Sequence, residues 1–216
     1  EKWELEKLPF YLQRLEERGI YYREDRELNK YLPVARRLEQ WEVEEKLLQI
    51  RRNSINRNYF GSERELELRR IFLRVREIRT LFNASFQIEE LRERFRLVIN
   101  EQFDHQMEAL REIYDEVCTF ENPGNSYRVG IVLDHLRYIL SIYFTPQEDQ
   151  VAEIDRFIAR YTNWNSSIDS TQFFEMIFHA HRTKYLILVR MGKWKEAGEC
   201  DGQIQEIYHQ TTPARR

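Results

Sequence analysis

Two pairs of residues have the types and the spacing that a metal site would need. Glu101 and His105 are four residues apart, as are Glu175 and His179, so each pair would share one face of a helix. Helical bundles that hold two metal ions use Glu-x-x-His instead, with further glutamates from other helices. We therefore expect solvated or capping roles for both pairs. His181, on an apolar stripe, is expected to be a hydrogen-bonded core histidine.

The sequence carries none of the common catalytic motifs. It has no glycine-rich phosphate loop, no Gly-x-Ser-x-Gly, no Cys-x-x-Cys and no His-Glu-x-x-His. The sequence therefore predicts a protein that is not an enzyme and that uses no cofactor and no metal ion.

Arginines gather in the segment 51–79. Residues 51–100 carry 12 Arg and 7 Glu, a net charge of +5, whereas residues 101–150 carry 3 Arg and 10 acidic residues, a net charge of −7. Guanidinium groups bind phosphates, and nearby aromatic rings can stack on bases. The interleaved glutamates and the net charge of −3 for the whole chain are unlike a basic nucleic-acid footprint. RNA binding through segment 51–79 is therefore the alternative function.

The same side chains also suit a protein partner. Arg, Tyr and Trp are the residue types that most often dominate the binding energy of protein interfaces. Several aromatic residues in expected loops have no helical stripe to join, although each could equally pack over the end of its own hairpin, above all Trp164. The candidate partner-binding residues are Arg69, Arg70, Arg74, Arg76, Tyr59, Phe60 and Trp164.

The elements that must position these residues are helices. Only 7 Gly and 5 Pro interrupt 216 residues, and apolar residues recur at helical spacing without a long alternating stretch. We expect helices over 9–18, 33–52, 62–83, 86–119 with a bend midway, 126–144, from 146 onward, 171–191 and 194–209. Ser62 with Glu65 forms a capping box, and loops are expected at 53–62 and 163–170.

About eight helices joined by short turns would form consecutive antiparallel pairs. Such pairs either close into a bundle or stack into an irregular α-solenoid. The fold class is therefore all-α. We expect one helical-repeat module over residues 1–216, with a possible subdivision near 120–126, where Asn122-Pro123-Gly124-Asn125 is the clearest helix breaker.

The segment 185–204 reads YLILVRMGKWKEAGECDGQI. Its Gly192, Trp194 and Ala197 resemble the turn of a tetratricopeptide repeat, where glycine permits a tight turn, an aromatic residue packs on the first helix and alanine allows close approach. The segment departs from the family at Tyr185, where a small residue is usual, and at Asp201, where an aromatic residue is usual. No second copy occurs at the family's period of about 34 residues. The resemblance implies helical hairpins of irregular length, as in divergent subunits of large assemblies.

Composition also bears on the compartment. The two cysteines, Cys118 and Cys200, cannot build a disulfide framework, which favours an intracellular location in the cytoplasm or nucleus. No apolar run approaches the roughly 20 residues of a membrane span. The chain begins at Glu1 without methionine, so we expect a segment of a larger protein. Together these features predict a non-catalytic protein–protein interaction scaffold, a subunit or module of an intracellular assembly whose partners are other protein subunits.

Overall fold

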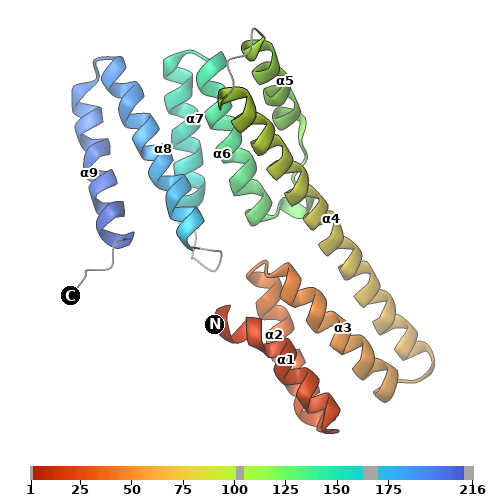
Figure 1. Ribbon diagram of the computed structural model, residues 1–216. Coiled ribbons are helices and arrows are strands. Elements are labelled where there is room, and N and C mark those ends of the chain that lie inside the picture. Colours follow the sequence, from red (N-terminus) through yellow and green to blue (C-terminus); the bar gives the residue numbers. More distant parts are fainter. Residues whose placement is uncertain (1, 101–104, 163–169, 212–216) are drawn as a thin grey trace. The chain divides into compact units, whose positions relative to one another are not determined.

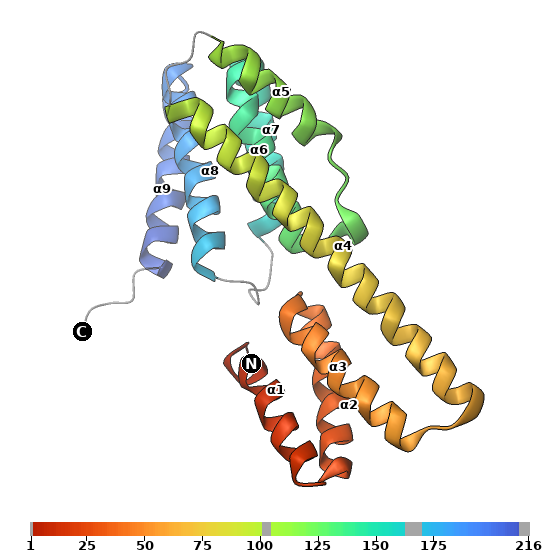
Figure 2. The same ribbon diagram turned by 45° about the vertical axis from the view of Figure 1, so that its right-hand side comes forward.

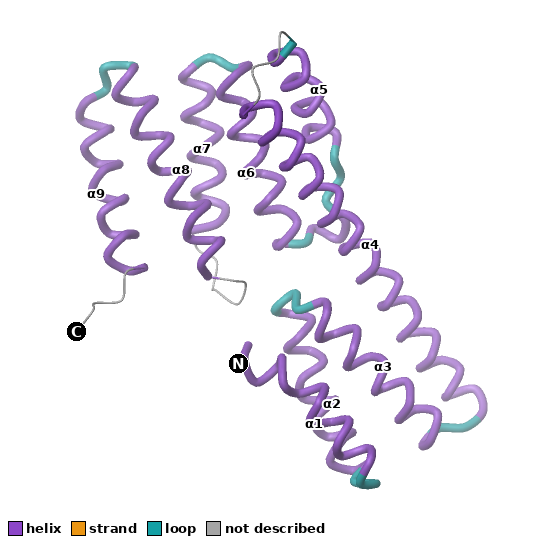
Figure 3. The backbone as a smooth tube through the Cα atoms, viewed as in Figure 1, coloured by secondary structure: helices purple, strands orange, loops and turns teal. Residues whose placement is uncertain are grey.

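The computed structural model describes residues 2–100, 105–162 and 170–211, and every regular element in these ranges is helical (Figures 1 and 3). The expected all-α class is confirmed for this part of the chain, which contains no strand. Its elements are α1 (Lys2–Glu17), α2 (Tyr21–Arg37), α3 (Trp41–Asn58), α4 (Gly61–Asn100), α5 (Gln106–Thr119), the 3-10 helix η1 (Pro123–Asn125), α6 (Tyr127–Phe144), α7 (Gln147–Thr162), α8 (Ser170–Arg190) and α9 (Trp194–Thr211).

The chain divides into two compact units, Glu1–Phe86 and Gln87–Arg216. Helix α4 contributes its residues up to Phe86 to the first unit and its remaining residues to the second. The functional module of residues 1–216 expected from the sequence stays a prediction, as does its possible subdivision near 120–126.

In the first unit, α1, α2 and α3 pack on one another around leucines spaced three, four or seven residues apart. This spacing places an apolar stripe along one side of each helix, and burying the stripes together removes them from water. The core comprises Leu5, Leu8, Leu12, Leu15, Leu28, Ala35, Leu38, Val43 and Leu47.

The expected helix 33–52 is wrong, because the chain reverses at Glu39. Glu39 has φ 48°, the left-handed conformation that glycine usually provides, and Pro33 lies inside α2 rather than at a helix start. The Gln40 N–H donates to the Ala35 carbonyl at 2.9 Å and so ends α2. The end of α1 has the same pattern, because the Ile20 N–H, just after Gly19, donates to the Leu15 carbonyl at 2.9 Å. No glycine marks this turn, so the local sequence does not signal it.

Helix α4 also differs from expectation, because it continues through 83–86, where a break was expected. Ala84 and Ile88 are buried and extend the stripe of Ile78 and Leu81 without interruption. The helix then ends at Asn100, so the expected continuous helix 86–119 is divided in two, and the residues between α4 and α5 that lie at 101–104 are outside the described ranges. The expected loop 53–62 is mostly helical, since α3 runs to Asn58 and α4 begins at Gly61.

In the second unit, each helix from α5 to α9 packs on the next one along the chain (Figure 2). The turn at 121–125 is confirmed, and Ser126 Oγ caps α6 by accepting the Val129 N–H at 3.2 Å. The expected turn at Gly192 is confirmed by its φ of 73°. The expected loop 163–170 falls outside the described residues except for Ser170.

The hairpin of α8 and α9 carries the segment that resembles a tetratricopeptide repeat. Ala197 is 2% exposed and clusters with Leu188 and Cys200, which matches the role of a small residue at a close crossing. Trp194, in contrast, is 69% exposed. The resemblance stays a prediction.

None of the helices in the described ranges has the length and apolar character that crossing a membrane requires.

Candidate partner-binding groove

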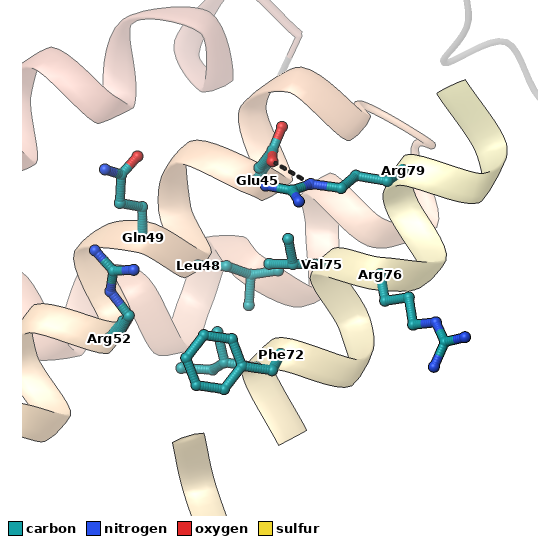
Figure 4. A pocket seen from close by; sticks show the side chains of 9 residues that line it. Glu45, Leu48, Gln49, Arg52, Phe72, Val75, Arg76 and Arg79 are labelled. Carbon is teal, nitrogen blue, oxygen red and sulfur yellow. Dashed lines mark ion pairs between the residues drawn. The ribbon is translucent and has the colours of Figure 1, made fainter. Parts of the chain in front are cut away.

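A groove of about 380 Å³ lies between α3 and the first part of α4 (Figure 4). Its lining combines an apolar floor with charged and polar side chains at the rim. The lining residues are Glu45, Leu48, Gln49 and Arg52 from α3, and Ile71, Phe72, Val75, Arg76 and Arg79 from α4.

Helical periodicity explains why these residues meet. The four α3 residues are numbered 45, 48, 49 and 52, and four of the five α4 residues are numbered 72, 75, 76 and 79. Each set follows the spacing i, i+3, i+4, i+7, which is one face of a helix. Two helices therefore present matching faces to the same space.

The floor of the groove is apolar and its mouth exposes an aromatic ring. Leu48 and Ile71 are buried, Val75 is half-buried, and Phe72 remains 57% exposed. Burial of an exposed Phe side chain is worth roughly 1.5–3 kcal/mol at full desolvation, so a ligand that covers this ring would gain part of that free energy.

The rim is positively charged. Arg79 Nε lies 3.8 Å from Glu45 Oε1, a long and exposed ion pair. The guanidinium groups of Arg52 and Arg76 have no ion-pair or hydrogen-bond partner among the described residues. Figure 4 shows Arg52 on the α3 side of the groove and Arg76 on the α4 side, where its guanidinium group points outward.

The sequence explains why these two arginines have no ion-pair partner on their own helices within the described residues. A helical side chain pairs locally with residues three or four positions away. For Arg76 those residues are Phe72, Leu73, Arg79 and Thr80, none of them acidic. The corresponding residues around Arg52 are Leu48, Gln49, Ile55 and Asn56, which also carry no carboxylate.

The other candidate arginines of α4 form ion pairs with glutamates. Arg69 pairs with Glu65 at 2.6 Å and Arg70 pairs with Glu67, both on the exposed surface. Of the four arginines singled out from the sequence, Arg76 alone lines the groove.

Arg74 forms an ion pair with a buried carboxylate in the first unit. Its Nε and Nη2 donate to the two carboxylate oxygens of Glu44 at 2.8 and 2.9 Å, and Glu44 is completely buried. Arg36 Nε donates to the same carboxylate at 2.9 Å. Hydrogen bonding to Glu44 raises the pKa of Arg74 above its ordinary value, so Arg74 carries a positive charge held by this carboxylate.

Two of the three aromatic candidates, Tyr59 and Phe60, do not line the groove. Tyr59 is half-buried just after α3, where its N–H donates to the Ile55 carbonyl at 3.0 Å. Phe60 follows it and is 79% exposed. Trp164 is outside the described residues.

The groove also contains residues that sequence reasoning missed as partner-binding candidates. Phe72 was expected on an apolar stripe and not as a binding residue, whereas Arg52 and Arg79 were considered only as part of the arginine-rich segment 51–79 for nucleic acid. The absence of an acidic residue three or four positions away distinguishes Arg52 and Arg76 from Arg69 and Arg70, each of which pairs with a glutamate one helical turn away.

Both histidines considered for a metal site have other neighbours. His105 lies exposed, 3.7 Å from Glu108, and His179 Nδ1 hydrogen-bonds the Tyr138 hydroxyl at 2.8 Å. Glu101 is outside the described residues, and within them no group of three or more His, Cys, Asp and Glu side chains could hold a metal ion.

His181 is buried, as expected, but differs from the expectation of a hydrogen-bonded ring. Its Nδ1 has no hydrogen-bond partner within the described part of the chain, and burial lowers its pKa. A neutral imidazole in an apolar surrounding is therefore the form present at neutral pH.

No protein-family model matches the chain, and no curated protein sequence matches it either.

Proposed function

We propose that this protein is a non-catalytic protein–protein interaction scaffold, a module or subunit of a larger intracellular assembly, and that the groove between α3 and α4 contacts a partner protein. The observation that supports this most directly is the combination of two unpartnered arginines, Arg52 and Arg76, with the 57% exposed ring of Phe72. Arginine and aromatic side chains around a partly apolar depression are typical of interface hot spots.

The helical arrangement supports the scaffold proposal. From α5 to α9 each helix packs on the next one in the chain, which is the contact pattern of an α-solenoid. In the first unit α1 packs on α3 as well as on α2, a closed contact pattern that is more typical of a bundle. We propose an irregular, tetratricopeptide-like solenoid for the second unit and a short bundle for the first.

RNA binding is the second candidate function, and the unpartnered arginines also favour it, because guanidinium groups bind phosphates. The apolar part of the groove weighs against it. The floor is aliphatic, with Leu48 and Ile71 buried and Val75 half-buried. A phosphate backbone offers no apolar side chain to cover this floor, whereas a protein segment does, so protein is the better partner class.

Affinity capture of the full chain from cells tests the proposal when three versions are compared. One version is wild type, one carries Phe72→Ala and Arg76→Glu in the groove, and one carries Leu73→Ala and Arg70→Glu. The third version is a matched control, since Leu73 and Arg70 lie on the same helix, are exposed and do not line the groove. Circular dichroism verifies that all three remain helical.

We expect mass spectrometry to identify a defined protein that wild type and the control retain and that the groove version loses. Recovery of RNA in place of protein, lost in the groove version, would support the second function instead. Retention of every protein by all three versions would contradict a role for the groove.

A direct nucleic-acid measurement separates the two functions. We expect no retention of the wild-type chain on single-stranded RNA or duplex DNA at about 0.15 M salt, where exposed charges are largely screened beyond roughly 8 Å. Micromolar binding that weakens steeply with added salt would reverse the order of the two candidates.

A further inference from the structure

The groove between α3 and α4 has a specific charge pattern that indicates what kind of segment it binds. Its lining holds three arginines and one glutamate, a net charge of +2, around an apolar floor. Of these charges only Glu45 and Arg79 face each other as an ion pair, at 3.8 Å. Two full positive charges therefore remain for a ligand to neutralise.

The unpartnered arginines of the groove contrast with the arginines outside it on the same helix. Arg69 and Arg70 each have a glutamate within reach one turn away, and Arg74 is held by the buried Glu44. These side chains would have to give up an existing partner before binding a ligand. Arg76 would not, because it has no ion-pair partner among the described residues.

The apolar element of the groove lies between the unpartnered charges. Phe72 projects one turn of α4 before Arg76, and Leu48 lies one turn of α3 before Arg52, so both helices place an apolar residue four positions ahead of the arginine. Figure 4 shows the Phe72 ring and Leu48 between Arg52 and Arg76. A ligand that covers the ring therefore has a cationic group available on either side.

We propose that the groove binds an acidic segment of a partner protein that carries at least one large apolar side chain, with the apolar side chain on Phe72 and Leu48 and carboxylates on Arg52 and Arg76. This inference rests on the proposed function and adds the chemistry of the partner. Carboxylates suit guanidinium groups because two parallel N–H donors meet two acceptor oxygens. An acidic partner also gains attraction during its approach to the groove.

Selection of a phage-displayed random peptide library on the immobilised full chain tests the proposal. We expect the enriched peptides to contain several Asp or Glu residues and a Leu, Ile, Phe or Trp. Replacement of the acidic residues by Asn and Gln in a synthetic copy of an enriched peptide should weaken binding about tenfold or more, because each lost charge pair removes both attraction and hydrogen bonds. Enrichment of neutral or basic peptides would overturn the proposal, as would the absence of any enrichment.

Variants of the chain locate the binding. Arg76→Glu and Arg52→Glu should each lower the affinity for the enriched acidic peptide about tenfold or more, and Phe72→Ala should lower it by a similar factor, since all three line the groove. The controls are Arg70→Glu and Leu73→Ala, for which we expect less than about a twofold change. Leu73 is a suitable control because it is 61% exposed, like Phe72, but does not line the groove. Successive helix residues point about 100° apart, so the side chain next to Phe72 points in a different direction.

The outcomes distinguish this inference from the proposed function. Equal loss of peptide binding in the Arg70→Glu control would show that general surface charge, not the groove, holds the peptide. Capture of a cellular protein that depends on the groove but lacks an acidic segment would overturn the partner chemistry and leave the interaction function in place. Binding of a synthetic RNA oligonucleotide that depends on Arg76, without enrichment of acidic peptides, would overturn both.

Discussion

Arg74 Nε and Nη2 donate to both carboxylate oxygens of Glu44, a residue 30 positions earlier in the chain that is completely buried. A buried carboxylate is stable only when its charge is compensated by close donors. This contact joins α3 to α4 at residues adjacent in sequence to Glu45 and Val75 of the groove lining, so it contributes to holding the two groove faces in place.

We expect Arg74→Met to lower the free energy of unfolding of the first unit by about 3 kcal/mol, because it leaves Glu44 with Arg36 as its only charged partner in the described residues. Hydrogen exchange measured by mass spectrometry should show faster exchange in α3 and in α4 up to Phe86. Arg70→Met removes an exposed pair on the same helix and should change stability by less than about 0.5 kcal/mol. Equal exchange in both variants would contradict the structural role of Arg74.

Gly130 in α6 should not tolerate a side chain. An added Cβ would lie 2.9 Å from Asn122 Nδ2 and 3.2 Å from the Tyr161 hydroxyl, and both groups are held by hydrogen bonds, to the Ser126 carbonyl and to Asp134. We expect Gly130→Ala to unfold at lower urea concentration than wild type, since crowding a packed site costs roughly 1–3 kcal/mol.

Gly198 in α9 provides the matched control for Gly130. No atom lies within 4 Å of a Cβ added there, within the described residues. Gly198→Ala should therefore stabilise by up to about 1 kcal/mol through helix propensity alone. Similar urea midpoints for the two alanine variants would contradict the close approach at Gly130.

Ala197 in α9 is expected to resist enlargement. It is 2% exposed beside Leu188 and Cys200, so Ala197→Leu should overpack this cluster and cost about 1–3 kcal/mol. Thermal unfolding followed by circular dichroism measures the change, with the exposed Glu199→Leu as the control. A melting temperature that is the same for both variants would show that α8 and α9 do not cross closely at Ala197.

The buried His135 should lower the free energy of unfolding in acid. Burial lowers its pKa from 6.5 to about 3, and its ring packs against Tyr138 and Phe157. Since the pKa is lower in the folded chain, the unfolded chain takes up the proton first. The free energy of unfolding should therefore fall as pH drops from about 6.5 toward 3, by up to about 1.4 kcal/mol per pH unit from this group.

Wild type is compared with His135→Phe between about pH 7 and about pH 4.5, which covers much of this window. The difference between the two proteins isolates the contribution of His135 to the free energy of unfolding. The difference between the two proteins cancels other groups, including the buried Glu24, whose pKa is raised by desolvation and which acts in the opposite direction. We expect urea midpoints to fall less with acid in the variant than in wild type. Parallel slopes in wild type and His135→Phe would contradict burial of an uncharged His135.

Much of the helical organisation could be predicted from local sequence. Gly192 and Pro123-Gly124 mark chain reversals because glycine adopts positive φ without steric cost and proline cannot continue a helix. The helix expected over 126–144 is observed as Tyr127–Phe144, and the hydroxyl of Ser126 accepts a backbone N–H at its start. Such signals depend on interactions between residues a few positions apart, which is why a single sequence reveals them.

The turn at Glu39 and the continuity of α4 could not be predicted in this way. Glu39 holds a positive φ that its own residue type does not favour, and the packing of Leu38 and Trp41 on either side of it accompanies that conformation. The weaker helix formers Asn83, Ser85 and Phe86 remain helical because Ala84 and Ile88 are buried on the same stripe. In both places burial of apolar side chains outweighs a local preference of at most about 1 kcal/mol per residue.

The sequence by itself determined that arginines concentrate in 51–79 and that Arg52 and Arg76 lack an acidic residue one helical turn away. Only the tertiary structure decided that Arg74 forms an ion pair with the buried Glu44, while Arg76 and Arg52 line one groove together with Phe72. The physical reason is that local pairing follows helix geometry, which spacing reveals, whereas pairing across helices depends on which faces pack together.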